Sequence, residues 1–178
     1  MSGPQERTAR SFSDRVRDAG ARVQLSPFDR LLDDAPELDR DRPLSPSEAM
    51  SVLKRAVRRD LEALLNAKRG WRSLPGLFPA LVNSNAGYGL PDYTAGSMAD
   101  ADARERFRQE IERTIRVFEP RFARIAVRLL DADARLDSTL RLKIEGLLHA
   151  DPAPEPISFD TIIDAATAEV AVKDDPFV

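Results

Sequence analysis

The 178 residues are enough for one domain with a sizeable core and an added tail. A formal net charge of -3 gives no electrostatic case for nucleic acid as the main ligand, and the absence of cysteine excludes disulfides and thiolate metal sites. The single histidine, His149, excludes most histidine-based metal centres, so we expect no metal and no cofactor. No segment has the roughly 20 apolar residues that span a bilayer, and residues 1–22 lack the apolar core of a signal peptide. We therefore expect a cytoplasmic protein that does not insert into membranes.

Residues 1–44 are predicted to form an N-terminal extension, and residues 45–178 the main domain. The extension is rich in Arg, Asp, Ser and Pro. Its one apolar cluster, with Phe28 and Leu31, fits a short helix that begins at Ser26 and Pro27. So short a helix is unstable alone and must lie on another surface. That surface is either the chain's own domain, which the helix would cover as a flap, or a partner, to which it would dock.

The first long helix is predicted from Ser45 to about Lys68, with Gly70 as its stop. Ser45-Pro46-Ser47-Glu48 combines an N-cap serine, a proline at the first helical position and a glutamate three residues after the cap. Apolar residues recur every three or four positions and predict the buried stripe, which comprises Met50, Leu53, Val57, Leu61, Leu64 and Leu65. A basic band lies off this stripe and comprises Lys54, Arg55, Arg58 and Arg59. The band is either a solvated face or a surface for an acidic partner.

A glycine-rich turn is predicted within the irregular segment 71–96. It comprises Gly87, Tyr88, Gly89, Leu90, Pro91 and Asp92, with positive φ expected at both glycines. It does not match a phosphate-binding loop, because no Gly-Lys-Ser/Thr is present and no strand comes immediately before it. We interpret it as a structural turn.

The second long helix is predicted from about Asp100 to Phe118, and the hydrophobic period changes directly after it. Proline disfavours the α region for the residue before it, so Pro120 should leave Glu119 extended. Glu119 and Arg121 then lie on either side of a rigid kink that is flanked by two phenylalanines. This corner is either a buried structural clasp or an exposed binding motif.

Beyond Pro120 the apolar residues alternate, which predicts strands. Two of them, around Val127 and Ile144, should pair as an antiparallel hairpin; a third begins near Ile157, and a short fourth contains Val170 and Val172. Helices followed by hairpins predict an α+β fold, with two main helices packed on one face of a small antiparallel sheet. We expect the segment from Ile157 to Lys173 to be the exposed edge, because it follows the hairpin.

Catalytic chemistry has one candidate residue. Glycoside hydrolysis needs two carboxylates, one of them in an apolar pocket. Glu119, between two phenylalanines, has that setting, but no spacing selects a second acid, and the nearby Arg121 disfavours a general-acid role. A serine nucleophile paired with His149 lacks a Gly-x-Ser-x-Gly elbow. Sheet edges, by contrast, are templates for a strand from another chain, so the residues favour an assembly component over an enzyme.

The order of several short motifs resembles the TssE family of type VI secretion baseplate proteins, which is similar to the phage baseplate wedge proteins at the base of the sheath. The motifs are Leu64-Leu65-Asn66, Tyr88-Gly89-Leu90-Pro91-Asp92, Phe118-Glu119-Pro120-Arg121 and Glu155-Pro156-Ile157-Ser158-Phe159-Asp160-Thr161. Phe28-Asp29-Arg30-Leu31 also looks like the family's N-terminal motif.

This resemblance implies an α+β fold and a structural role in the baseplate wedge. It implies a sheath initiator, with other wedge subunits and the contractile sheath subunits as partners. Glu119, Pro120 and Arg121 match the motif that joins the family to the wedge core, and Phe28 and Leu31 are further candidate protein-binding residues. The family has also been called lysozyme-like, which keeps a peptidoglycan-cleaving hydrolase using Glu119 as the alternative. A nucleic-acid binder that uses the basic band is disfavoured by the acidic balance.

Overall fold

A computed structural model describes residues 29, 31, 44–70, 79–92, 100–130, 139–151, 153–164 and 166–175. The expected short helix with Phe28 and the polar connection after Leu130 lie outside the described residues. Leu31 is described and is 81% exposed. None of the described helices is long and apolar enough to cross a membrane.

Helix α2 (Pro46–Asn66) begins with the expected capping box. The Ser45 hydroxyl accepts a hydrogen bond from the Glu48 backbone N–H, and the Glu48 carboxylate accepts one from the Ser45 backbone N–H at 2.8 Å. The predicted apolar stripe is buried, with Met50 at its rim. The predicted stop at Gly70 is wrong. The chain becomes extended at Ala67, and β1 (Lys68–Arg69) pairs in parallel with β2 (Leu90–Pro91).

The predicted glycine turn is only partly a turn. A short 3₁₀ helix, η1 (Pro79–Asn83), precedes it, and a second, η2 (Asn85–Gly87), includes its first residue. Gly89 has the expected positive φ of 90°, but Gly87 does not. Gly87 is instead required by space, because a Cβ there would lie 2.2 Å from the Val82 carbonyl oxygen. Leu90 and Pro91 are buried in β2, whereas Asp92 is exposed.

Helix α3 (Ala101–Phe118) starts where the sequence predicts, with the Asp100 carboxylate accepting a hydrogen bond from the Ala103 N–H. It ends at Phe118, and β3 (Phe122–Leu130) begins four residues later. The change of period at Pro120 therefore marks the real junction between helix and sheet.

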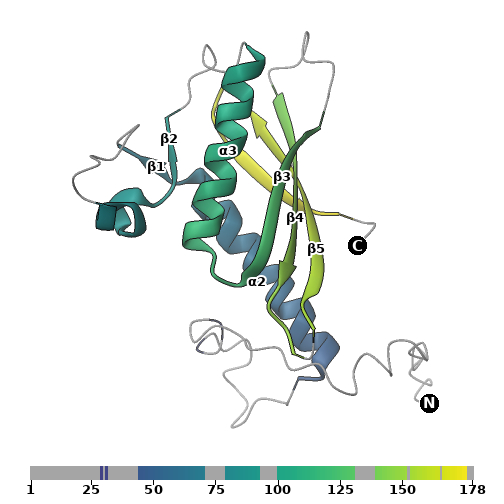
Figure 1. Cartoon of the computed structure of the whole chain (residues 1–178). Helices are drawn as coiled ribbons and strands as arrows, with labels where there is room; N and C mark the ends of the chain where they lie inside the picture. Colours follow the sequence, from purple (N-terminus) through teal and green to yellow (C-terminus); the bar gives the residue numbers. More distant parts are fainter. Residues whose placement is uncertain are drawn as a thin grey trace, which may run out of the picture.

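The remaining strands are β4 (Thr139–Leu148), β5 (Glu155–Asp164) and β6 (Val170–Asp174). The four strands form one antiparallel sheet in the order β3-β4-β5-β6. Helices α2 and α3 lie on the same face of this sheet (Figure 1), with α3 packed against β3 and α2 against β6. The core between the layers confirms the α+β prediction; its largest fully buried side chains include Leu61, Ile111, Ile115, Leu142, Ile144, Leu148, Phe159 and Ile163.

The expected edge segment is half right. In the described sheet, β6 lies at one edge, as predicted. Strand β5, which holds the start of the expected segment, is paired on both sides. The other edge is β3, the first strand of the hairpin.

Candidate protein-binding site

The corner between α3 and β3 is a tight, hydrogen-bonded turn. Glu119 caps the helix, and its N–H donates to the Ile115 carbonyl at 2.8 Å. Its φ of -121° and ψ of 79° lie outside the α region, which the following proline disfavours. The Glu119 carbonyl then accepts from the Phe122 N–H at 3.3 Å. Pro120 is the exposed tip of this turn.

Glu119 and Arg121 bind each other across Pro120. The Glu119 side chain is 6% exposed and that of Arg121 is 19% exposed. Arg121 Nε donates to Glu119 Oε1 at 2.6 Å, and Arg121 Nη2 donates to Glu119 Oε2. Two parallel bonds between a guanidinium and a carboxylate fix the geometry as well as the charge. The sequence left open whether this motif is a buried clasp or an exposed binding motif. In the structure the ion pair is a largely buried clasp, and only the proline between its two residues is exposed.

Asp29, and Arg59 and Asp60 of α2, join this pair. We call the whole set of five residues the charged corner: Asp29, Arg59, Asp60, Glu119 and Arg121. Arg121 Nη2 also donates to Asp60 Oδ2 on α2 at 2.6 Å. Arg59 bonds to both Asp60 and Asp29, each at 2.9 Å. Three carboxylates face two guanidinium groups, so the corner carries one excess negative charge.

The electrostatics of the charged corner favour the ionised pair. Burial by itself would lower the pKa of Arg121, but its hydrogen bonds to Glu119 and Asp60 outweigh this and raise the pKa above its usual value. Arg121 Nη1 has no hydrogen-bond partner among the described residues and lies 3.9 Å from Asp29 Oδ2.

Tyr88 extends the charged corner towards the surface. Its ring meets the Phe118 ring edge-on, with 5.4 Å between the ring centroids, and it is 39% exposed. Burial, and then the charges of Asp60 and Glu119, raise the pKa of Tyr88. The predicted turn therefore places an exposed aromatic residue beside the Glu-Pro-Arg motif, which the sequence did not reveal.

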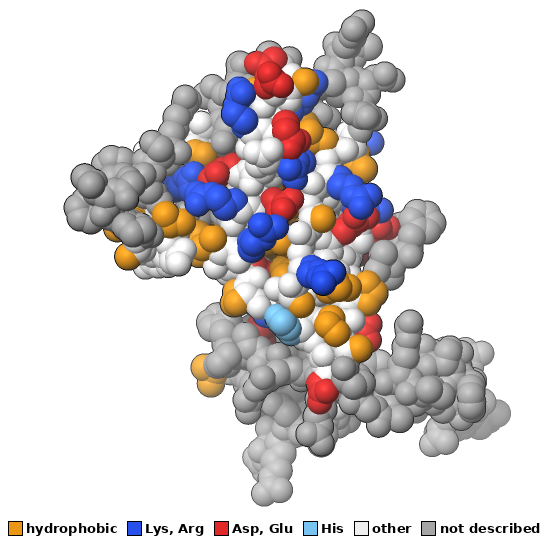
Figure 2. All heavy atoms as spheres, viewed as in Figure 1, with side chains coloured by type: hydrophobic (Ala, Val, Ile, Leu, Met, Phe, Trp, Pro, Cys, Tyr) orange, Lys and Arg blue, Asp and Glu red, His pale blue; other side chains and the backbone are white. Residues whose placement is uncertain are grey.

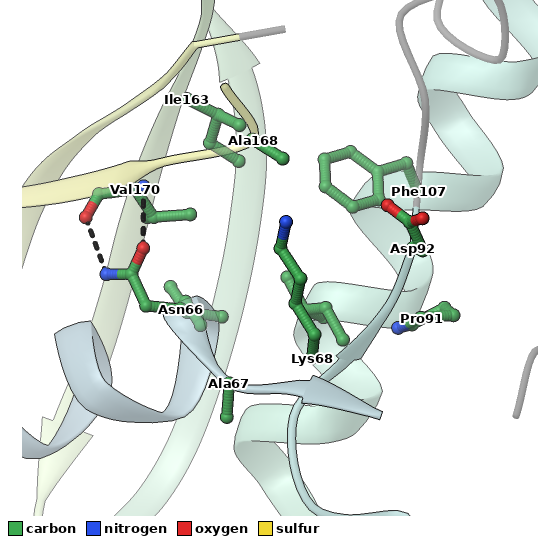
Figure 3. A pocket seen from close by; sticks show the side chains of 11 residues that line it. Asn66, Ala67, Lys68, Pro91, Asp92, Phe107, Ile163, Ala168 and Val170 are labelled. Atoms are coloured by element: carbon green, nitrogen blue, oxygen red, sulfur yellow. Dashed lines mark hydrogen bonds between the residues drawn. The ribbon is translucent and has the colours of Figure 1, made fainter. Parts of the chain in front are cut away.

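This arrangement is poorly suited to acid catalysis. Both oxygens of Glu119 are occupied by Arg121, so neither is free to give a proton to a leaving group. No cluster of three metal-binding side chains occurs in the described ranges. The cavity beside Asn66 and Phe107 holds only about 30 Å³ (Figure 3).

The edge of β3 is covered at its middle by two side chains of α3. Val127 is not hydrogen-bonded to β4 through its own N–H and C=O, which point away from the sheet. Its N–H donates to Glu112 Oε2 at 3.3 Å, and its carbonyl accepts from Arg108 Nη1 at 3.0 Å. Arg108 and Glu112 also bind each other at 2.8 Å. They belong to the alternating charges visible along α3 in Figure 2.

Among the described residues, a side chain is hydrogen-bonded to the edge of β6 at its first residue alone. Figure 3 shows the Asn66 amide facing Val170. The Val170 N–H donates to Asn66 Oδ1 at 2.9 Å, and Asn66 Nδ2 donates to the Val170 carbonyl at 2.8 Å. The amide thus takes the place of a residue on a neighbouring strand. The outward groups of Val172 and Asp174 meet no such partner in the described part of the chain.

These features, a helix-to-sheet corner with a Glu-Pro-Arg motif and a sheet with two edges, agree with a comparison to protein families. The family model described as baseplate wedge protein gp25 matches residues 51–153. The chain belongs to the baseplate wedge protein gp25 family. This family includes TssE, so the resemblance identified from the sequence is confirmed at the level of the family. No curated protein matches the sequence. Membership of the gp25 family supports a structural role in the baseplate of a contractile injection system and interaction with other baseplate components.

Sequence reasoning missed several residues of the candidate site and of the sheet edges. Asp60 was an unremarkable acid on α2, yet it bonds to Arg121, which lies 61 residues further along the chain. Asn66 belongs to the Leu64-Leu65-Asn66 motif, but the sequence does not indicate that its amide binds the Val170 backbone. Arg108 and Glu112 had one local signal, their four-residue spacing, which puts them on one face of α3 but does not show that they reach a strand.

Proposed function

We propose that this chain is a TssE-type subunit of a type VI secretion baseplate, working in the cytoplasm without catalysis. It joins the wedge core through the charged corner and starts sheath polymerisation by accepting a strand at the edge of its sheet. Membership of the gp25 family supports the baseplate role. The observation that carries the mechanism is a corner locked by its own ion pair next to a sheet whose edges are only partly covered.

The charged corner docks as a preformed shape. Because Glu119 and Arg121 bind each other, their charges are neutralised within the chain and need no partner for this. The surface offered outward is Pro120, the edge of Tyr88 and the exposed fifth of Arg121. A surface that is rigid before binding loses little conformational entropy on association. Phe28 and Leu31 remain proposed additional contacts of the extension.

Binding of purified wedge subunits tests the role of the corner. We expect Pro120→Ala and Arg121→Ala, checked for folding by circular dichroism, to weaken binding at least about tenfold, or 1.4 kcal/mol. Arg113→Ala is the matched control, because Arg113 is an exposed arginine of α3 that pairs with Glu110. Equal affinities for Arg121→Ala and Arg113→Ala would remove the corner from the docking surface.

Sheath initiation has its own measurement. Unpaired N–H and C=O groups on an edge strand can accept a strand from another chain. We expect the purified chain, together with wedge subunits, to shorten the lag before sheath subunits polymerise. A lag that does not depend on the chain would contradict the proposal.

The enzymatic alternative has no supporting observation. A turbidity assay on purified cell walls compares the wild type with Glu119→Gln. We expect no clearing by either protein. Clearing by the wild type that Glu119→Gln loses would replace the structural proposal with a hydrolase.

A further inference from the structure

We propose that β6 is the edge that receives the added strand, and that this strand places a carboxylate between Lys54 and Arg55 in a cavity at the end of β6. The inference rests on the proposed function, because it assumes that the sheet gains a strand from a sheath subunit. It adds which edge is used and what chemistry the incoming segment carries.

The first argument is that β3 is closed at its centre. A strand added there needs the outward N–H and C=O of Val127, and Glu112 and Arg108 already hold both. These two side chains are about one-fifth exposed and bind each other, so displacing them leaves two charges with weaker partners. Covering an edge with other groups is a known way of preventing unwanted strand pairing.

The second argument is that β6 is closed only at its start. Asn66 holds Val170, but pairing with β5 alternates along the strand, so Val172 and Asp174 also direct their N–H and C=O outward. Within the described ranges, no side chain forms a hydrogen bond to these backbone groups. The Asn66 amide therefore fixes the position of the incoming strand, which pairs from Val172 towards Asp174.

The third argument is the cavity that lies where β6 ends. It has a volume of about 310 Å³, and its lining comes from α2, β5 and the end of β6: Ser51, Lys54, Arg55, Ile157, Ser158, Asp174 and Asp175. Ser51, Lys54 and Arg55 belong to α2 and therefore approach the cavity from the helix-covered face of the sheet.

The charges in this cavity favour an anion. Asp175 is paired with Lys143 at 2.8 Å, and Asp174 lies 3.7 Å from Arg58. No ion pair of Lys54 or Arg55 is found within the described residues, so these two cations are left to attract the ligand. The basic band therefore has two halves: Arg59 belongs to the charged corner, whereas Lys54 and Arg55 face the end of β6.

A photocrosslinking experiment with sheath subunits distinguishes the two edges. The chain has no cysteine, so one introduced cysteine takes a benzophenone label at a single position. Lys173→Cys and Arg128→Cys are matched positions, because both side chains are exposed and lie in one row across the sheet, at opposite edges. We expect sheath subunits to crosslink to position 173 at least tenfold more than to position 128.

Charge variants test the carboxylate in the same assay. Lys54→Glu with Arg55→Glu should reduce crosslinking from position 173 at least tenfold. If the charge reversal impairs folding, the milder double variant Lys54→Gln with Arg55→Gln replaces it. This variant should reduce crosslinking from position 173 several-fold. Arg104→Glu with Arg106→Glu, on α3, makes the same change of net charge and should leave the yield unchanged.

Each outcome decides the matter. Crosslinking from position 128 alone, or from neither position while the chain still shortens the polymerisation lag, overturns the choice of β6 and leaves sheath initiation standing. Crosslinking from position 173 that ignores both charge variants overturns the carboxylate. A chain that never shortens the lag overturns the proposed function, and this inference with it.

Discussion

Replacing Glu119 with glutamine tests whether the charged corner is held together by its own charges. The substitution keeps the shape of the side chain but leaves Arg121 with Asp60 as its close partner, at 2.6 Å. Removing one partner of a buried ion pair typically costs about 3–5 kcal/mol, because the other charge stays buried without compensation. Since Asp60 remains and Arg121 is 19% exposed, we expect a smaller loss, about 2–3 kcal/mol in the free energy of unfolding.

Urea unfolding followed by circular dichroism measures this loss. With a slope of about 2 kcal/mol per molar urea, the midpoint should fall by roughly 1–1.5 M. Glu169→Gln is the control, because Glu169 is exposed in the turn before β6. Its midpoint should move by less than about 0.3 M, the change expected for an exposed carboxylate.

A double-mutant cycle assigns the loss to the pair. Glu119→Gln and Arg121→Gln should together cost at least about 1 kcal/mol less than the sum of the two single changes. If Glu119→Gln behaves like the Glu169 control, or if the two losses add, the corner is not stabilised by this pair. Its rigidity could then no longer support the docking proposal.

Three further predictions address the rest of the fold. Gly146→Ala should destabilise the protein by about 1–3 kcal/mol, because its Cβ would lie 2.6 Å from the Phe122 ring, and Phe122→Leu should restore part of the loss in the same urea assay. Asn66→Ala should cost about 1–3 kcal/mol and speed hydrogen exchange of the Val170 amide, whereas unchanged exchange would mean that Asn66 does not cover that edge. With the other tyrosine replaced by phenylalanine, ultraviolet titration should place the pKa of Tyr88 above the ordinary value of a tyrosine, because burial and two nearby carboxylates disfavour the phenolate. A phenol with a raised pKa binds its proton more tightly in the folded protein, so the stability should fall as the pH rises from the unfolded pKa towards the folded pKa. A titration of Tyr88 at the ordinary pKa of tyrosine would contradict its packing against Phe118.

The sequence alone determined the two long helices, the four strands of the main sheet and the fold class. The capping box at Ser45, the period of three to four in both helices and the switch to alternation after Pro120 are local signals, because each depends on residues a few positions apart. For the same reason the four strands, and the hairpin formed by the first two, were predictable, whereas the order of the strands in the sheet came only from the structure. The stop of α2 was not, since Ala67 becomes extended to meet β2, which lies about twenty residues further along the chain.

Only the tertiary structure decided how the charges are used. The sequence placed Glu119 and Arg121 on either side of a proline but left open whether they bind each other or a partner. Asp60 settles their geometry from another helix, and Asn66, Arg108 and Glu112 decide which backbone groups of the sheet edges remain open. Hydrogen bonds and ion pairs depend on distances between groups far apart in the chain, and hydrophobic periodicity carries no information about those distances.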